Sequence, residues 1–340
     1  MKHHQITIKD IAQQLGISPS TVSRALKDHP DISALTKNKV KTLAKELKYR
    51  PNAVALSLQS NKSNIIGIIV PQIVHHFFSS VISGIEEYAT EKGYSVIITQ
   101  SNEIIKKEIK NCQILVSSRV DGIIVSRTKH TSDFKHFQNI IDRDIPMVFF
   151  DRTCHGLKTD RVIIDDYRAS YEATEYLIKT GCKKIAHFSG PEILKISAKR
   201  MWGFRDALKK NNMPINESLI IKADNFDDAK KITQQLISNN NIPDGIFAVN
   251  DMTAAGAINV LHKNNIKIPE EVSVIGFTNG IVSKITDPSL TTVEQNGFEM
   301  GKKSAEILIN RIEDENEENI NYINEIVPTK LILRKSTKNL

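Results

Sequence analysis

The hydrophobic residues follow one pattern in the first fifty positions and a different one in the rest of the chain. Near the N-terminus they have the i, i+3, i+4, i+7 spacing of a helix with one apolar face, at Ile8, Ile11, Ala12 and Leu15. Gly16 can adopt the left-handed conformation that ends such a helix. Ser18 and Pro19 then supply an N-cap and a first helical residue, so a second helix is predicted to start at once.

A third helix is expected from about Thr36 to Lys48, with an apolar face formed by Val40, Leu43, Ala44 and Leu47. Two short helices joined at a glycine are typical of a helix-turn-helix motif, whose second helix lies in the major groove of DNA. Residues 1–50 are therefore predicted to form an all-α headpiece.

From about residue 64 onward, apolar runs alternate with amphipathic stretches. The predicted strands are Ile65–Val70, Tyr94–Thr99, Gly122–Val125, Pro146–Phe150, Ile185–Ser189, Gly245–Val249 and Val272–Phe277. The predicted helices are Phe77–Glu91, Ile104–Ser117, 133–142, Tyr167–Lys179, Ala198–Lys210, Asp227–Asn239 and Asp251–Lys263. This alternation indicates parallel sheets covered by helices on both faces. Because the series divides into two halves, the fold class is predicted to be α/β, with two doubly wound lobes after the headpiece.

Charge is concentrated at the start of the chain. The 340 residues include 46 Lys and Arg against 39 Asp and Glu, a formal net charge of +7. Residues 1–63 contain eleven basic and four acidic residues, so the whole excess lies there. A basic module on a neutral body favours a polyanionic partner, most often nucleic acid, although a solvated basic surface has the same composition.

Composition and motifs argue against several other classes of protein. The apolar run Ile65–Val70 is too short to span a membrane, and no signal peptide is expected. Three widely spaced cysteines fit a reducing, cytoplasmic compartment. Nucleotide-binding glycine motifs and a nucleophile elbow are absent, so we predict no enzyme, no catalytic residue and no cofactor. The adjacent His75 and His76 fit a cleft lining better than a metal site, so no metal is predicted.

The start of the predicted second helix should meet base edges, through Pro19, Ser20 and Arg24. Ser20 and Arg24 are four residues apart and share a face. The guanidinium of Arg24 can donate two hydrogen bonds to guanine, worth about 1–3 kcal/mol of discrimination. A phosphate contact or a surface ion pair is the alternative for Arg24.

Several hydroxyl groups near the same helix are better placed to bind DNA phosphates. Such contacts fix the position of the protein on the duplex but do not distinguish between base pairs. The groups are the hydroxyls of Thr7, Thr21 and Ser23, together with the amines of Lys37 and Lys39. Ser18 is expected to cap the second helix, with or without a phosphate contact.

The runs "TIKDIAQQLGISPSTVSRALKD" from Thr7 and "YRPNAVALSLQS" from Tyr49 resemble the headpiece and hinge of the lactose-repressor (LacI/GalR) family of bacterial transcription regulators. The resemblance implies a hinge helix in residues 51–63 that pairs across a dimer and contacts DNA through Asn52, Ala53, Leu56 and Leu58. Leu58 would be the wedge that enters the minor groove and bends the duplex, unless it only packs within the hinge. Leu56 departs from the family, in which Arg or Gln is common.

Residues 64–340 resemble the family's effector domain, which has the shape of a periplasmic sugar-binding protein. The resemblance includes the run "LTTVEQNGFEMGKKSAEILI" from Leu290. It implies crossings between lobes near 162–166, 292–296 and 326–329. The N-lobe would comprise about 64–164 and 295–327, and the C-lobe about 165–294 and 328–340.

Ligands of doubly wound folds bind at the carboxyl ends of strands. By motif match, the residues there that correspond to the family's effector contacts are Phe77, Phe78, Asp151, Arg200, Phe226 and Asn250. Aromatic rings, carboxylates, amides and guanidinium groups suit a sugar, another ring or an anion. The alternatives are core packing for Phe78, capping or pairing with Arg152 for Asp151, a structural role for Asn250 and a helix cap for Asp251.

Thr278 stands where the family usually carries an effector-binding Asp. A hydroxyl accepts hydrogen bonds more weakly than a carboxylate and carries no charge. The ligand therefore either lacks the hydroxyl pair or amine that the Asp would hold, or is anionic.

Together these observations predict a homodimeric, sequence-specific DNA-binding regulator, a repressor, with a pseudo-palindromic operator and no membrane partner. A small molecule between the lobes, a sugar or sugar derivative, would control its affinity for double-stranded DNA. The alternatives are a regulator that answers to a partner protein, and a sugar-binding protein or enzyme on the same scaffold.

Overall fold

Three helices, α1 (Ile8–Leu15), α2 (Pro19–Leu26) and α3 (Ala34–Glu46), lie in the N-terminal unit of the chain, Met1–Ser63, in the computed structural model. The structure describes residues 6–49, 62–314 and 321–340. Gly16 has a left-handed φ of 62° and ends α1 as the sequence predicts. The third helix begins before the expected Thr36 because Ser33 caps it, by accepting a hydrogen bond from the N–H of Thr36.

The three helices pack around a small apolar core. Its buried members are Ile11, Ala12, Val22, Ala25, Val40 and Ala44. These are the apolar positions of the helical pattern, so burial of one stripe per helix explains the arrangement. The polar faces of all three helices remain available to solvent.

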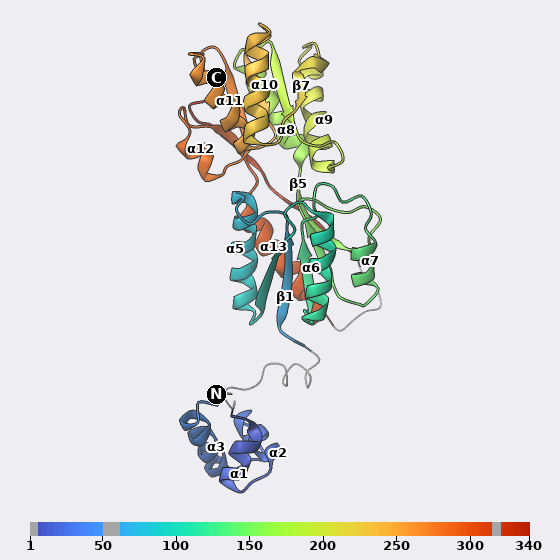
Figure 1. Cartoon of the computed structure of the whole chain (residues 1–340), viewed down its shortest axis with the longest axis vertical. Helices are drawn as coiled ribbons and strands as arrows, with labels where there is room; N and C mark the ends of the chain where they lie inside the picture. The colour runs from blue at the N-terminus through green and yellow to red at the C-terminus, as the bar shows by residue number, and fades with distance from the viewer. Residues whose placement is uncertain (1–5, 50–61, 315–320) are drawn as a thin grey trace. The chain divides into compact units, whose positions relative to one another are not determined.

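The second unit, Asn64–Leu340, contains two lobes (Figure 1). The sheet of the N-lobe has the order β11-β5-β4-β3-β1-β2. Its strands are β1 (Ile65–Val70), β2 (Ser95–Gln100), β3 (Gly122–Val125), β4 (Met147–Phe150), β5 (Asp160–Ile164) and β11 (Asn324–Val327). Helices α5 (His76–Glu91) and α13 (Gly297–Glu313) pack on one face, and α6 (Ile105–Ser117) and α7 (Lys135–Ile141) on the other.

The C-lobe repeats this architecture with a sheet of the order β12-β10-β9-β8-β6-β7. Its strands are β6 (Ile185–Ser189), β7 (Ile220–Lys222), β8 (Gly245–Ala248), β9 (Ser273–Thr278), β10 (Thr291–Glu294) and β12 (Lys330–Ile332). Helices α8 (Asp166–Lys179) and α9 (Lys195–Lys210) cover one face, and α10 (Phe226–Ser238) and α11 (Asp251–Lys263) the other. A 3-10 turn, η1 (Glu217–Leu219), and a short helix, α12 (Ile281–Ile285), complete the lobe.

These sheets confirm the predicted α/β class with two doubly wound, mainly parallel lobes. One strand differs from the expected pattern: β12 runs antiparallel to β10, pairing Thr292 with Ile332. The chain passes between the two sheets after Ile164, after Glu294 and after Val327. Strands β5, β7, β10, β11 and β12 and helices α12 and α13 were not predicted from the hydrophobic pattern. Helix α9 begins three residues before the predicted start at Ala198.

Two glycines let neighbouring helices of the C-lobe approach closely. A Cβ at Gly203 of α9 would overlap the backbone carbonyl of Tyr167 on α8. A Cβ at Gly256 of α11 would likewise overlap the carbonyl of Phe226 on α10. Glycine is therefore required at both positions for these helix pairs to pack at their observed separation. Each helix pair contributes residues to the lining of the cleft described below.

A histidine lies in the centre of the C-lobe core. His187 of β6 is fully buried, and its ring stacks on Phe247 with centroids 5.0 Å apart and on Phe204 at 5.2 Å. Its Nδ1 lies 3.0 Å from the carbonyl oxygen of Phe247 and can donate a hydrogen bond to it. Burial disfavours the charged ring and lowers the pKa of His187 to about 4.

This histidine makes C-lobe stability depend on pH. Because the folded-state pKa lies below the usual histidine value of 6.5, the neutral ring contributes its full stability above that pH, and this contribution is lost as the pH falls towards 4. The resulting decrease in the free energy of unfolding is limited to about 3 kcal/mol. We predict that His187→Phe, which keeps the stacked ring, flattens the fall of the melting temperature between pH 6.5 and 4.5. His262→Gln, at an exposed histidine of α11, should retain the wild-type slope. An unchanged slope in His187→Phe would contradict this assignment.

Candidate functional site

The N-terminus of α2 carries a cluster of three hydroxyl groups. Ser18 caps the helix, since its Oγ accepts a hydrogen bond from the N–H of Thr21 at 3.1 Å. The same oxygen lies 2.7 Å from Oγ of Ser20 and 2.8 Å from Oγ1 of Thr21. The structure therefore shows the capping role of Ser18 and leaves the cluster beside the free N–H groups of the first turn, where an anion is favoured.

The outward face of α2 is polar and exposed. Val22 and Ala25 are buried in the headpiece core, which turns Pro19, Ser20 and Arg24 to solvent. Thr21 and Ser23 are half-buried at the edges of this face. Thr7, in front of α1, is exposed, and both its N–H and its hydroxyl donate to Oδ2 of Asp10 at 2.7 Å. Asn52, Ala53, Leu56 and Leu58 lie outside the residues that the structure describes, so their predicted DNA contacts remain predictions.

A cleft of about 690 Å³ lies between the two lobes. The loops at the carboxyl ends of strands from both sheets form its lining, as the doubly wound folds require. All seven residues predicted as effector contacts line it: Phe77, Phe78, Asp151, Arg200, Phe226, Asn250 and Thr278. Its volume is in the range of sites for small molecules.

Arg200 is the buried centre of the C-lobe side of the cleft. Its Nε donates to Oδ1 of Asp166 at 2.8 Å, and its Nη1 donates to the carbonyl oxygen of Val249 at 2.8 Å. The guanidinium carbon lies 3.7 Å from the centroid of the Phe277 ring, a close cation–π contact. Burial raises the pKa of Asp166 to about 6, and the charge of Arg200 opposes that rise. One guanidinium thus joins the starts of α8 and α9 to the ends of β8 and β9.

On the N-lobe side, Arg152 organises the polar groups. Its Nη1 donates to Oε1 of Glu103 at 2.7 Å, and its guanidinium lies 5.6 Å from the centroid of the buried Phe78 ring. Its Nε is 3.8 Å from Oδ2 of Asp151. Burial raises the pKa of Asp151, while Arg152 and Arg200 act to lower it. Phe78 therefore both packs in the hydrophobic core and lines the cleft. Asp151 pairs with Arg152 in the wall of the cleft.

Asn250 and not Asp251 caps α11. Oδ1 of Asn250 accepts the N–H of Thr253 at 2.8 Å, while its Nδ2 donates to the carbonyl oxygen of Asp224 at 2.9 Å. The interpretation of Asp251 as a cap is wrong, because its buried carboxylate instead accepts the N–H of Gly280 and the hydroxyl of Thr292. That carboxylate holds the loop after β9 to β10.

Thr278 occupies a conformation that is unusual for a β-branched residue, with φ of 135°. Its hydroxyl donates to Oε1 of Gln295 at 3.0 Å, next to the crossing that follows β10. Phe226, the first residue of α10, is half-buried in the cleft lining. The predicted contact residues thus surround one volume from both lobes.

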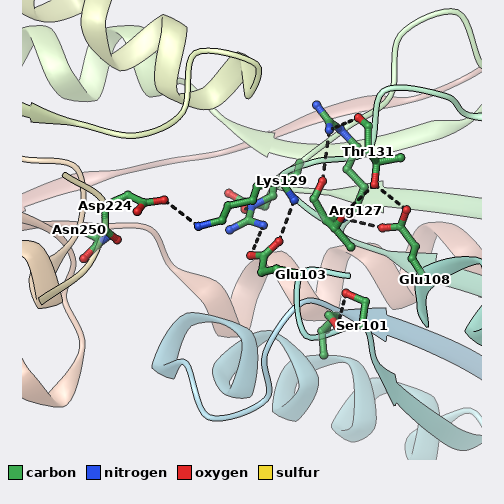
Figure 2. Close-up of polar contacts among 12 residues, drawn as sticks. Ser101, Glu103, Glu108, Arg127, Lys129, Thr131, Asp224 and Asn250 are labelled. Carbon is green, nitrogen blue, oxygen red and sulfur yellow. Dashed lines mark hydrogen bonds and ion pairs between the residues drawn. The ribbon is translucent and has the colours of Figure 1, made fainter. Parts of the chain in front are cut away.

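The sequence pattern did not reveal the ion pair that joins the lobes across this cleft. Nζ of Lys129, in the loop after β3, lies 3.0 Å from Oδ2 of Asp224, in the loop before α10 (Figure 2). The backbone N–H of Lys129 donates to Oε2 of Glu103. Both loops are polar and aperiodic, so no periodic signal connects the two positions.

Two features are absent from the described residues. No helix among them is long and apolar enough to cross a membrane. In the same part of the chain, no group of three or more His, Cys, Asp or Glu side chains is arranged to hold a metal ion.

Comparison with known proteins gives matches over both units. Residues 63–332 match the family model described as periplasmic binding proteins and sugar binding domain of LacI family. Residues 7–52 match the model for bacterial regulatory proteins, lacI family. The chain belongs to the LacI family of bacterial regulators.

Individual LacI-family relatives align along almost the whole chain. The HTH-type transcriptional repressor PurR of Vibrio parahaemolyticus is 35% identical over 338 residues, with 98% of this chain and 99% of the relative covered. The ribose operon repressor of Halalkalibacterium halodurans is 33% identical, with 98% and 97% covered. A lac repressor dimer bound to operator and the anti-inducer ONPF has the same fold, with a TM-score of 0.86 at 23% identity, over 99% of this chain and 100% of that one.

The buried pair at Arg200 should control the stability of the C-lobe of this LacI-family protein. We predict that Asp166→Asn lowers the free energy of unfolding by about 3 kcal/mol or more, because it leaves a buried guanidinium without its counter-charge. Urea unfolding followed by the fluorescence of Trp202, the single tryptophan and a residue of α9, measures this. Glu217→Gln removes the solvent-exposed partner of Arg205, a residue of α9, and should lower the free energy of unfolding far less. Equal decreases in the free energy of unfolding in the two variants would refute the role of Asp166 as the buried counter-charge of Arg200.

Base reading and phosphate binding are predicted to fall on different side chains of the headpiece. We expect Arg24→Ala to abolish the preference for one base pair per half-site, a loss of about 1–3 kcal/mol confined to that position. Lys39→Ala, at an exposed lysine of α3, should weaken binding to all sequences alike and reduce the salt dependence by about one charge. Affinities for a panel of single-base operator variants distinguish the two. A uniform loss in Arg24→Ala would identify Arg24 as a phosphate contact.

Proposed function

We propose that this chain is a transcriptional repressor that binds a pseudo-palindromic operator as a homodimer and responds to a small molecule between its lobes. The observation that carries the proposal is the combination, in one chain, of a solvent-facing Ser20–Arg24 surface on α2 with a cleft of about 690 Å³. The first feature suits the major groove of DNA and the second suits a ligand of sugar size. Residues 1–50 would read DNA, 51–63 would form the hinge, and 64–340 would bind the effector and the second copy.

The charge pattern supports the DNA-binding part. All of the net charge of +7 lies within residues 1–63, and the exposed face of α2 has its first-turn N–H groups and hydroxyls at one end. Phosphates bind at such helix N-termini, and lysines supply the affinity that depends on salt. Arg24 is the side chain that we propose reads a base. The protein would act in the cytoplasm, with its operator.

The electrostatics of the cleft support a neutral, hydroxylated effector, such as a sugar or sugar derivative. The three Lys and Arg side chains that line the cleft each have a carboxylate partner: Lys129 with Asp224, Arg152 with Glu103, and Arg200 with Asp166. An anion would have to compete with these carboxylates. Phe226 offers a ring, and Asp151, Asn250 and Thr278 offer groups that bind hydroxyls. The seven predicted residues are therefore our proposed effector contacts.

The relatives fit this division of roles. Two of them are repressors, and one structure with the same fold is a repressor dimer on its operator with a ligand bound. Of these proteins only the lac repressor structure is described with a ligand, the anti-inducer ONPF. The identity of the effector must therefore come from binding measurements on this chain.

DNA binding is tested by a salt titration of the full chain with duplexes selected from random sequence. We expect a steep negative slope of log affinity against log salt, and selected half-sites related by a two-fold axis. Failure to bind any duplex at low salt would refute the proposal and favour a ligand-binding protein on the same scaffold.

The effector is tested separately by calorimetry against a panel of sugars and nucleosides. Binding of a neutral sugar that Asn250→Ala weakens at least tenfold supports the cleft assignment. Silence across the panel, with DNA binding intact, would instead favour control by a partner protein.

A further inference from the structure

A second, smaller cavity lies beside the cleft. Its volume is about 220 Å³, and we call it the hinge cavity. Four residues, Asp151, Arg152, Leu194 and Ile196, line both cavities and form the wall between them. The remaining lining comes from the loops after β3 and β4, from β5 and β11, and from the start of α8 and α9. No residue that lines only the hinge cavity was among the predicted contacts.

Basic side chains dominate the lining. They are Arg127, Arg152, Arg161, Lys195, Lys199 and the titratable His155. The two acidic residues, Asp151 and Asp166, are already paired with Arg152 and Arg200. The hinge cavity thus has the opposite charge balance from the cleft, in which each cation has a carboxylate partner.

Four of these cations have no ion-pair partner in the part of the chain that the structure describes. Arg127, Arg161, Lys195 and Lys199 form no ion pair there with a carboxylate. Nε of Arg161 is buried and, within the same described residues, has no hydrogen-bond partner. Its Nη2 donates to the carbonyl oxygen of Leu157 at 3.1 Å, which holds the side chain in place. A buried N–H without an acceptor is a group that a ligand oxygen can satisfy.

The positive charges also repel one another. Burial, followed by the charges of Lys199 and Arg161, lowers the pKa of Lys195. Burial and four neighbouring cations lower the pKa of His155. An anion between these groups would remove this repulsion.

Hydrogen bonds within the protein hold part of the lining of the hinge cavity in place without a ligand. Arg127 donates to the carbonyl oxygens of Thr131 at 2.8 Å and Thr153 at 3.2 Å, and its place in the N-lobe loop is visible in Figure 2. Helix α9 starts at Lys195, and its N-cap residue, Leu194, offers no side-chain acceptor to the first turn. The first-turn N–H groups therefore add to the positive potential of the cations.

We propose that the hinge cavity is a second ligand site, which binds the phosphoryl group of a small phosphorylated molecule. A tetrahedral dianion can accept hydrogen bonds from Arg161, Lys195 and Lys199 at once. Arg161 belongs to the N-lobe strand β5, and both lysines belong to the C-lobe helix α9. Binding therefore links the lobes on the outer side of the cleft wall, and any preference for one lobe angle changes the affinity of the cleft for its own ligand.

The test compares three forms of the full chain without DNA, so its outcome does not depend on operator binding. They are the wild type, Lys195→Gln/Lys199→Gln in the hinge cavity, and Lys209→Gln/Lys210→Gln at the far end of the same helix. Both double variants remove two positive charges from α9. Lys195, Lys209 and Lys210 are exposed, and Lys199 is half-buried. Inorganic phosphate, glucose 6-phosphate and glucose are titrated by calorimetry at constant ionic strength.

We expect a phosphate-containing probe to bind the wild type and the far-end variant equally, and the hinge-cavity variant about tenfold more weakly or worse. Glucose should not distinguish the three proteins. Equal binding of inorganic phosphate and glucose 6-phosphate identifies free phosphate as the ligand, whereas a preference for the ester identifies a phosphorylated metabolite. Equal affinity in all three proteins, or no phosphate binding to the wild type at about 10 mM, would overturn the proposal.

Discussion

The buried guanidinium of Arg200 is the constraint on which the ligand-facing side of the C-lobe depends. An ionised group with almost no exposure to water is tolerated only where counter-charge and acceptors surround it. Asp166, the carbonyl of Val249 and the face of Phe277 meet this need, and they come from the start of α8 and the ends of β8 and β9. The positions of three cleft-forming segments are therefore tied to one side chain, and Gly203 allows α9 to approach α8 closely enough for the pair to form.

From this constraint follows the contrast between the two neighbouring cavities. In the cleft, each lining Lys and Arg has a carboxylate partner, as Figure 2 shows for Lys129 and Asp224. In the hinge cavity, Asp166 forms its ion pair with Arg200, and Lys195 and Lys199 form none with a carboxylate of the described residues. One wall thus separates a volume suited to a neutral polar ligand from one suited to an anion.

Much of the fold could be predicted from the sequence because its strong elements have strong patterns. Strand β1 is buried on both faces and reads as an unbroken apolar run, and the headpiece helices have capping residues at their starts. The elements that were missed lack such patterns. Strand β5 begins with Asp160 and Arg161, and β10 is mostly Thr and Glu, because these strands lie near the crossings, where polar partners replace apolar burial.

The site was predictable only as far as position along a strand determines it. The carboxyl ends of the strands indicated where the cleft lies, and the resemblance to the family supplied its seven predicted contact residues. Pairings across the cleft instead depend on loops that are distant in sequence. Lys129 and Asp224 are 95 residues apart, and Asp251 bonds to Gly280 and Thr292 instead of capping its own helix. Local spacing contains no information about such contacts.

We propose that the cleft and the DNA-binding surface are coupled, and thermodynamic reciprocity tests this coupling most directly. The operator affinity of the full chain is measured with and without saturating cleft ligand, and the ligand affinity with and without operator, in the same buffer. We predict that the ligand changes operator affinity severalfold or more, and that the operator changes ligand affinity by the same factor. A ligand that binds in the cleft and leaves operator affinity unchanged would contradict it.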